Sequence, residues 1–342
     1  MKRKHINDVQ TLTVDEHFKL LLTEKNVIDS KLINETTPDD LPDWYNEKLF
    51  REAQNYYKRN MMAIGLSNIM GLLAIIAIPD ILRVLVYTKK SNTPHIAFSR
   101  YSQTLLHIHN LYICDPNKAD SNWYKTINVI HWKHKTSSTK SKKADVGGIY
   151  QKDLALTQFA FLGYVLLTPK SIGIRIKPEE EEAFIHFWRV VGYMLGIPDK
   201  LNLCRKNAVE THELLQKISS NILTNYLKEA PADFYHVVSI IVRSLWYIDA
   251  TLDTDALLAF IYRLHNIKYK VPLKWYSWLN MNYRDLMLYL CLVPHIGQVV
   301  KLYFKYILTF SIWFIQIWPV HAWMSYGKKN SQIKLYPKYN NI

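Results

Sequence analysis

Apolar residues recur along most of the chain at alternating steps of three and four positions. This spacing places them on one face of a helix. A clear case is the stretch 95–114, where the apolar positions are Phe98, Tyr101, Leu105, Ile108 and Tyr112. We find no sustained alternation at every second position, the pattern typical of a half-buried strand. The pattern therefore predicts an all-α protein.

The same periodicity gives approximate bounds for the helices. The best-defined helix runs from Pro178 to Leu195: Pro178 suits a first helical turn, Glu179–Glu182 suit the positive end of the helix dipole, and Gly196 and Pro198 end it. Over the rest of the chain we expect helices at 44–59, 95–114, 122–135, 153–167, 206–228, 232–249 and 254–267.

The domain organisation follows from changes in composition along the 342 residues. Residues 1–44 are polar and predict a loosely attached N-terminal arm. A single helical domain is expected over 45–282, followed by hydrophobic helices over 283–325 and a basic tail over 326–342. With 49% apolar residues and only 10 glycines, the chain favours a large core of long helices over a sandwich or barrel.

Residues 61–78 contain no charged side chain, which is close to the shortest length that can cross a bilayer. We favour a buried core helix here over a membrane span. Asp80 and Arg83 follow at once, and the apolar pattern continues beyond them. Gly65 and Gly71 would let a neighbouring helix approach closely.

The net charge of +14 would suit a nucleic acid or an anionic membrane. The densest basic stretch runs from Lys133 to Lys143, and we interpret it as a solvated loop. No zinc-finger, RRM, KH or helix-turn-helix pattern accompanies it, so no nucleic-acid partner is expected.

The sequence contains no GxGxxG, P-loop, GxSxG or HExxH motif, but four histidines fall close together: His107, His109, His131 and His134. One hypothesis is a shared non-haem metal. Against it, His107 and His109 would point about 200° apart on a helix. The other hypothesis is haem, which needs one axial histidine, an apolar pocket and a cation for its propionates. His131 fits the second, since it shares a helix face with apolar side chains.

Four segments, in order, resemble the oxygenase domain shared by latex-clearing proteins (rubber oxygenases) and the ER-bound mpaB-type oxygenase of mycophenolic acid biosynthesis. They are RYSQT at 100–104, VIH at 129–131, YQKDLA at 150–155 and EEEAFIHFWRVVGYMLGIP at 180–198. The resemblance is to the uncharacterised eukaryotic members more than to the bacterial enzymes. It implies a single globin-like helical domain that binds haem b and oxidises an apolar, isoprenoid- or lipid-like substrate with O₂.

The resemblance also implies roles for individual residues. His131 would be the proximal iron ligand, and Arg100 and Thr104 would line the haem pocket, Arg100 pairing with a propionate or with bound oxygen. Rubber oxygenases have a lysine where this chain has Gln103. We therefore expect no lysine amine on the iron, and this difference counts against polyisoprene as the substrate. The alternatives are a catalytically inactive membrane-associated scaffold and a non-haem metal oxygenase.

The C-terminal region predicts attachment to a membrane. Tyr306–Met324 contains no Lys, Arg, Asp or Glu, and as a helix it would measure about 28 Å. Gln316, Pro319 and His321 would be costly at mid-depth, so a helix in the interface or a shallow hairpin fits better than a perpendicular span. The alternative is a last layer of the core. The expected location is a membrane, with the endoplasmic reticulum implied by the resemblance, and the cytoplasm is the alternative.

Overall fold

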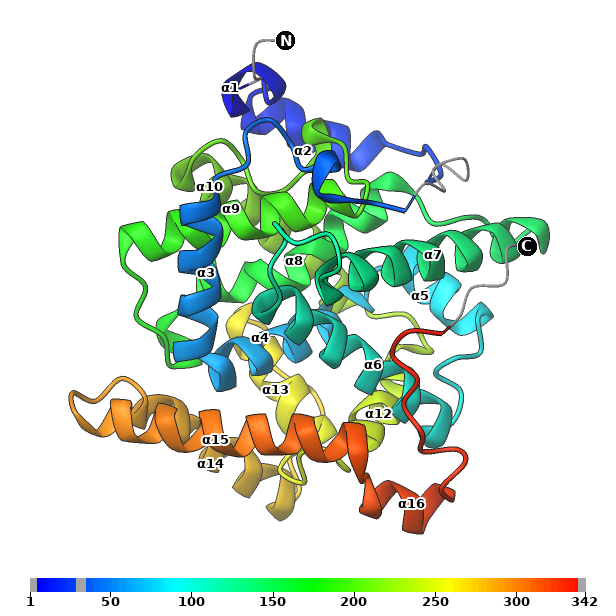
Figure 1. Cartoon of the computed structure of the whole chain (residues 1–342). Helices are drawn as coiled ribbons and strands as arrows, with labels where there is room; N and C mark the ends of the chain where they lie inside the picture. Colours follow the sequence, from blue (N-terminus) through cyan, green and yellow to red (C-terminus); the bar gives the residue numbers. More distant parts are fainter. Residues whose placement is uncertain (1–4, 29–34, 338–342) are drawn as a thin grey trace.

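The computed structural model describes residues 5–28 and 35–337. Within these ranges it contains helices and no β-strand, apart from one isolated bridge between Val27 and Tyr150. The all-α prediction is confirmed. The helices stack in rough layers, with the N-terminal segment at one end of the molecule and the C-terminal helices at the other (Figure 1).

The helix bounds follow the apolar periodicity closely. The first half of the chain forms α1 (Ile6–Val9), α2 (Val14–Thr23), η1 (Pro38–Asp40), α3 (Glu47–Arg59), α4 (Met61–Ile75), α5 (Pro79–Tyr87), α6 (Pro94–Ile113), α7 (Asn122–Lys143) and α8 (Gln151–Leu167). The second half forms η2 (Lys170–Ile172), α9 (Pro178–Met194), η3 (Asp199–Leu201), α10 (Ala208–Ile218), η4 (Ser219–Leu223, a π turn), α11 (Thr224–Lys228), α12 (Phe234–Leu245), α13 (Thr254–Leu264), α14 (Trp275–Leu290), α15 (Ile296–Ile317) and α16 (Val320–Tyr326).

The centre of the core is the packing of α4 against α8, with α3 against α9 beside it. Helix α4 is apolar all round and mostly buried, which confirms the core helix expected over 61–78. It stops at Ile75, and Pro79 begins α5 at an angle of 93° to it. A side chain at Gly71 would overlap the backbone carbonyl of Ala160, so this glycine sets the approach of α4 to α8.

The basic stretch from Lys133 to Lys143 is not a solvated loop, contrary to expectation. Helix α7 continues through it. Ser138 and Ser141 are buried on its inner side, and the hydroxyl of Ser138 accepts a hydrogen bond from the Ile149 amide at 2.9 Å. The lysines near the end of α7 lie at the negative pole of the helix dipole, which favours helix over coil.

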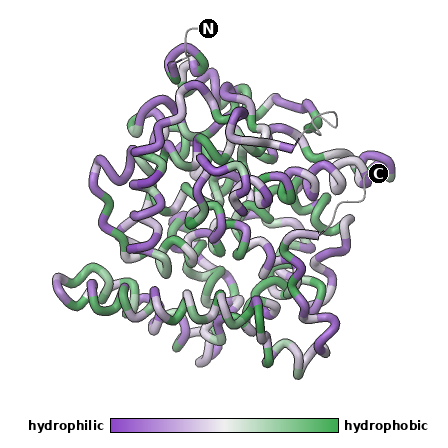
Figure 2. The backbone as a smooth tube through the Cα atoms, viewed as in Figure 1, coloured by the Kyte–Doolittle hydropathy of each residue, from purple (hydrophilic) through white to green (hydrophobic). Residues whose placement is uncertain are grey.

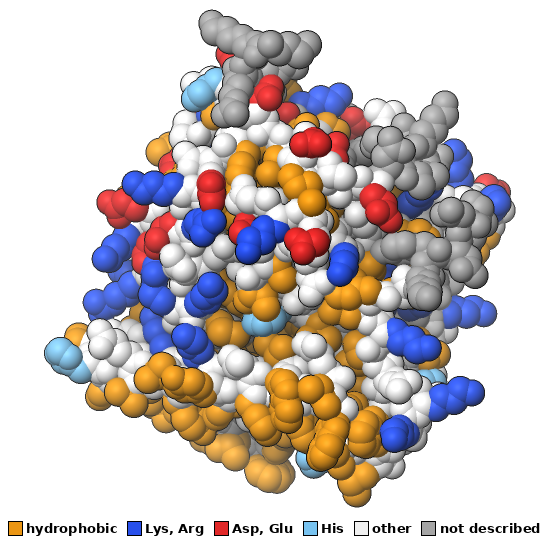
Figure 3. Space-filling model, in the orientation of Figure 1, with side chains coloured by type: hydrophobic (Ala, Val, Ile, Leu, Met, Phe, Trp, Pro, Cys, Tyr) orange, Lys and Arg blue, Asp and Glu red, His pale blue; other side chains and the backbone are white. Residues whose placement is uncertain are grey.

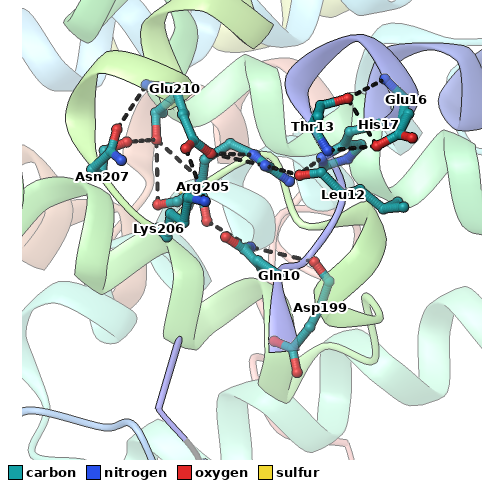
Figure 4. A network of polar contacts seen from close by, with 12 residues as sticks. Gln10, Leu12, Thr13, Glu16, His17, Asp199, Arg205, Lys206, Asn207 and Glu210 are labelled. Atoms are coloured by element: carbon teal, nitrogen blue, oxygen red, sulfur yellow. Dashed lines mark hydrogen bonds and ion pairs between the residues drawn. The ribbon is translucent and has the colours of Figure 1, made fainter. Parts of the chain in front are cut away.

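The N-terminal arm is also more firmly attached than its composition suggested. The guanidinium of Arg205 is fully buried, donates to the Leu12 carbonyl and forms an ion pair with Glu210 at 2.8 Å (Figure 4). Beside it, Gln10 donates to the Cys204 carbonyl at 3.1 Å, and His17 faces the guanidinium. A buried charge needs such partners, so this network fixes the arm to the domain.

Helices α14, α15 and α16 lie together at one end of the molecule (Figure 1). Among the described residues, α15 is the one continuous helix long and apolar enough to cross a membrane, and 6% of its 18-residue apolar window is buried. Helices α4 and α5 pass the same test only as a bent pair. Beyond α16 the chain returns to α6 and α7, where the Tyr336 hydroxyl accepts a hydrogen bond from Asn110 at 2.7 Å.

Candidate functional site

The predicted site residues lie on two adjacent helices. Helix α6, which begins at Pro94, contains Arg100, Gln103 and Thr104, and α7 contains His131. The two helices pack against each other. Arg100, Gln103 and Thr104 are half-buried, as is His131. The structure therefore brings the predicted residues to neighbouring helices, although not all of them to one point.

The side-chain amide of Gln103 makes hydrogen bonds on both sides. Its Oε1 atom accepts a hydrogen bond of 2.7 Å from the Nζ atom of Lys133 on α7, and its Nε2 atom donates to Ser99 at 3.3 Å. The resemblance predicts that no lysine amine binds the iron, because Gln103 stands where rubber oxygenases have a lysine. The structure places the Lys133 amine of α7 against Gln103, and the prediction about the iron stays a prediction. Spacing along the chain does not reveal this contact, because it depends on how α6 packs against α7.

Lys133 belongs to a cluster of cations with Arg100 and the more exposed Lys90. Burial, followed by repulsion from Lys90 and Arg100, lowers the pKa of Lys133 to about 8. Arg100 makes only two long contacts, of 3.5 Å, to the hydroxyls of Thr88 and Ser91. No ion pair from these three cations to a carboxylate occurs in the part of the chain that the structure describes. Such an uncompensated cluster favours binding of an anionic group.

Two histidines of α7 are possible ligands, and they face different neighbours. The Nε2 atom of His131 lies 3.1 Å from the position that a Cβ atom would take at Gly196, beyond the end of α9. Burial, with Lys135 next, lowers its pKa. His134, one turn further on, has a buried Nδ1 atom without a hydrogen-bond partner among the described residues. Burial, then repulsion from His131, Arg100 and Lys133, lowers the pKa of His134 to about 4.

The two α6 histidines diverge, as their spacing requires. His109 forms a hydrogen bond of 3.0 Å with the Tyr57 hydroxyl. His107 is buried, and neither of its ring nitrogens has a partner within the described ranges. Over residues 5–28 and 35–337, no three His, Cys, Asp or Glu side chains come together as a metal site. The non-haem hypothesis therefore has no ligand set in this part of the chain.

Thr104 faces the apolar interior. Its hydroxyl donates to the Arg100 carbonyl at 3.1 Å, and its side chain lines a cavity of about 10 Å³ with Ile69, Leu73 and Leu245. This volume holds at most one water molecule. For haem, the donor groups fit: an unpartnered histidine nitrogen and cations without counter-charges. The space between α6 and α7 is too small for a porphyrin, because the contact between Lys133 and Gln103 holds the two helices together. These helices must separate to admit haem.

The segment of α9 that contains Trp188 and Arg189 makes buried structural contacts. The indole nitrogen of Trp188 donates to the Tyr112 hydroxyl at 2.9 Å, and Arg189 donates to the Cys204 carbonyl at 3.0 Å. Gln158 on α8 donates to the Trp188 carbonyl at 2.8 Å. These buried contacts join α6, α8 and α9, and they account for the segment without any catalytic role.

Comparisons with known proteins give a weak likeness to one solved fold. No family model matches the chain, and no curated protein does. Among solved structures, the chain is similar to latex clearing protein in its closed state, with 13% sequence identity over 80% of this chain and 76% of that chain, and a TM-score of 0.49. Agreement of this size does not by itself assign a substrate, a cofactor or a ligand.

Proposed function

We propose that this chain is a haem-b-dependent oxygenase that acts on an apolar substrate with O₂. The supporting observation is the juxtaposition on α6 and α7 of a histidine ring with a buried, unpartnered nitrogen and a cation cluster without carboxylate partners. A bound haem would supply an iron atom for the histidine nitrogen and two propionates for the cation cluster. When bound, it would provide the chemistry of O₂ activation, and the chain would provide position and polarity.

The iron ligand is proposed to be a histidine of α7. The family resemblance favours His131. The contacts around the rings favour His134, because its buried Nδ1 atom has no hydrogen-bond partner in the described ranges. We adopt His134 as the working assignment, with His131 as its alternative.

The other residues of the site have proposed roles that follow from their contacts. Arg100 and Lys133, with Lys90 at the rim, would bind the propionates, as charge-assisted hydrogen bonds are the strong ones. Thr104 would lie at the boundary between the haem and the apolar side chains of α4 and α12. That boundary would place a hydrocarbon substrate, isoprenoid or lipid-like, on the α4 side of α6.

The proposed location is a membrane, and the resemblance to an ER-bound oxygenase favours the endoplasmic reticulum over the cytoplasm. A membrane would also be the source of an apolar substrate. The second candidate function is a catalytically inactive membrane-associated scaffold. The observation that favours it is the apolar cavity of about 10 Å³ beside Thr104, which leaves little room for a substrate as the helices stand.

Titration of the purified apoprotein with haemin separates these candidates. We expect saturable binding of one haem per chain. The double variant with Lys90→Met and Arg100→Met should bind about 10- to 100-fold more weakly, because charged hydrogen bonds to the propionates are lost. Lys48→Met, at an exposed site on α3, is the matched control and should leave the affinity unchanged. Absence of saturable binding in the wild type would favour the scaffold.

A further inference from the structure

The most apolar stripe of α15 faces away from the protein. Its members follow alternating steps of three and four, so they form one continuous face. All are exposed: Ile296, Val299, Tyr303, Tyr306, Phe310, Trp313 and Ile317. The inner side of the helix is narrow, with Gly297 and Ile315 buried and Leu308 and Ile312 against the core. In a soluble protein such a stripe turns inward, so α15 is built to cover something other than its own domain.

Helices α14 and α16 extend this surface. The exposed apolar side chains of α14 are Trp275, Trp278, Leu279, Tyr283, Leu286 and Tyr289, and Met324 on α16 is 82% exposed. We call these exposed side chains of α14, α15 and α16 the apolar end surface. Hydrophobic residues recur along the backbone of α15 (Figure 2). In the space-filling view, apolar side chains gather along the edge where these helices lie, whereas the opposite end displays mixed charges (Figure 3). A continuous patch of this kind marks an interaction site.

The charges around the surface indicate its partner. Among the described residues after Asp285 there is no Asp or Glu, and four lysines lie on α15 or directly after α16, at 301, 305, 328 and 329. Lys328 lies over the Trp323 ring, with its ammonium 5.5 Å from the ring centroid. Tryptophan and tyrosine at an apolar edge with lysines beside them fit the headgroup region of an anionic bilayer. Two copies of the chain facing each other here would bring like charges together.

The orientation follows from how α15 is held. It packs along α3, α4 and α14, and the chain breaks at Pro319 before the short helix α16. A helix that crossed a bilayer would have to leave this packing. Its apolar stripe would also cover only one of its sides, whereas a spanning helix meets lipid all round unless partners cover it.

We propose that the apolar end surface docks onto one leaflet of an anionic membrane, with α15 lying in the plane of the headgroup–acyl boundary. The inference deepens the proposed membrane location and does not depend on haem. Attachment of this kind adds the energies of apolar burial and of lysine–headgroup attraction. It would hold the domain with the α14–α16 end toward the lipid, from which an apolar substrate can be drawn.

Vesicle flotation of the full-length protein tests the surface. We expect flotation with vesicles of phosphatidylcholine and phosphatidylserine, and weaker flotation with phosphatidylcholine alone. The double variant Phe310→Glu and Trp313→Glu should reduce the bound fraction about ten-fold or more. Val209→Glu, at an apolar site on α10 that is 77% exposed, should leave it unchanged. A wild type that forms a stable dimer in light scattering and does not float would overturn the proposal.

Spin labels at successive turns of the stripe test the orientation. With the native cysteines replaced by alanine, labels at Val299→Cys, Tyr306→Cys and Trp313→Cys should report equal, shallow depths from oxygen and nickel-chelate accessibility. A spanning helix would instead place the middle label deepest, and that outcome would overturn the in-plane orientation while leaving membrane attachment intact. Haemin binding by the double glutamate variant should equal that of the wild type, so failure of docking and failure of the haem proposal are distinguishable.

Discussion

The Nζ atom of Lys133 on α7 donates a hydrogen bond of 2.7 Å to the Oε1 atom of Gln103 on α6. Position 103 is where rubber oxygenases have a lysine, and from the sequence the amine is missing here. The structure brings the Lys133 amine from the neighbouring helix to the Gln103 side chain. Burial, and then repulsion from Lys90 and Arg100, lowers the pKa of Lys133 to about 8. The hydrogen bond to Gln103 directs the amine toward α6.

The spectrum of the ferric protein tests what this amine does. We expect the haem-loaded wild type to be five-coordinate or to bind water, because Gln103 is neutral and a poor iron ligand and the Lys133 amine would bind a propionate. Gln103→Lys should shift the absorption and electron paramagnetic resonance spectra toward six-coordinate low spin. Lys133→Met is the companion variant and should leave the wild-type spectrum unchanged. A low-spin wild type that Lys133→Met converts to high spin would show that Lys133 itself binds the iron.

The choice of ligand on α7 is tested by alanine variants. His134→Ala should lose stoichiometric haem, while His131→Ala and His109→Ala should retain it, since the buried Nδ1 atom of His134 has no partner among the described residues and His109 is bound to Tyr57. The measurement is the ratio of haem to protein. Added imidazole should restore haem binding to His134→Gly. If His131→Ala loses haem and His134→Ala retains it, the assignment returns to His131, as the family resemblance implies.

A pair of glycines in α4 tests the core packing. Gly71→Ala should lower the free energy of unfolding by about 2 kcal/mol or more, because its Cβ would overlap the Ala160 carbonyl on α8. Gly65→Ala meets no atom within 4 Å and should raise the free energy of unfolding by about 0.5–1 kcal/mol, through helix propensity alone. Urea titrations give both values. Equal effects at the two sites would contradict the close approach of α4 and α8.

Buried histidines outside the candidate site make stability depend on acid. Burial lowers the pKa of His17 and of His265 to about 4 and that of His186 to about 3, from a usual value of 6.5. Below pH 6.5 the unfolded chain therefore binds protons that the folded chain excludes. Stability is complete above about pH 6.5 and falls as the pH approaches 4, by up to about 4 kcal/mol per pH unit for three groups.

Urea midpoints between pH 7 and pH 4 give this slope. His17→Asn should make it shallower by about one proton, since one buried imidazole no longer resists protonation. His236→Asn, at an exposed site on α12, is the control and should leave the slope as it is. A wild type whose midpoint does not change over this range would contradict the burial of these histidines as neutral rings.

Local signals in the sequence were sufficient to predict where most helices lie. They did not predict the contacts between residues far apart in the chain. Pro178 and the glutamates after it determine where α9 begins, and these residues act within one turn. The end of α7 was misplaced because lysine and serine suit a loop and an exposed helix equally, and only the burial of Ser138 against Ile149 separates the two.

For the candidate site, the sequence predicted which residues share a helix but not which helices pack against each other. Arg100, Gln103 and Thr104 lie together because they share one helix. Lys133 joins them through a crossing of α6 and α7 that no spacing rule encodes. The N-terminal arm is a similar case, since the contact of Arg205 with Leu12 spans 193 positions of the chain. The polar composition of the arm predicted loose attachment, because composition does not show that a charged side chain such as Arg205 becomes buried against the arm when the chain folds.

The haem content of full-length protein, purified with detergent from cells supplied with iron and a haem precursor, tests the central claim most directly. The pyridine haemochrome spectrum gives the type and the amount of haem. We predict haem b at one equivalent per chain, with a Soret band that disappears in the variant lacking the α7 ligand. A folded, helical protein that contains no haem, and that binds none when haemin is added, would contradict the assignment as a haem oxygenase.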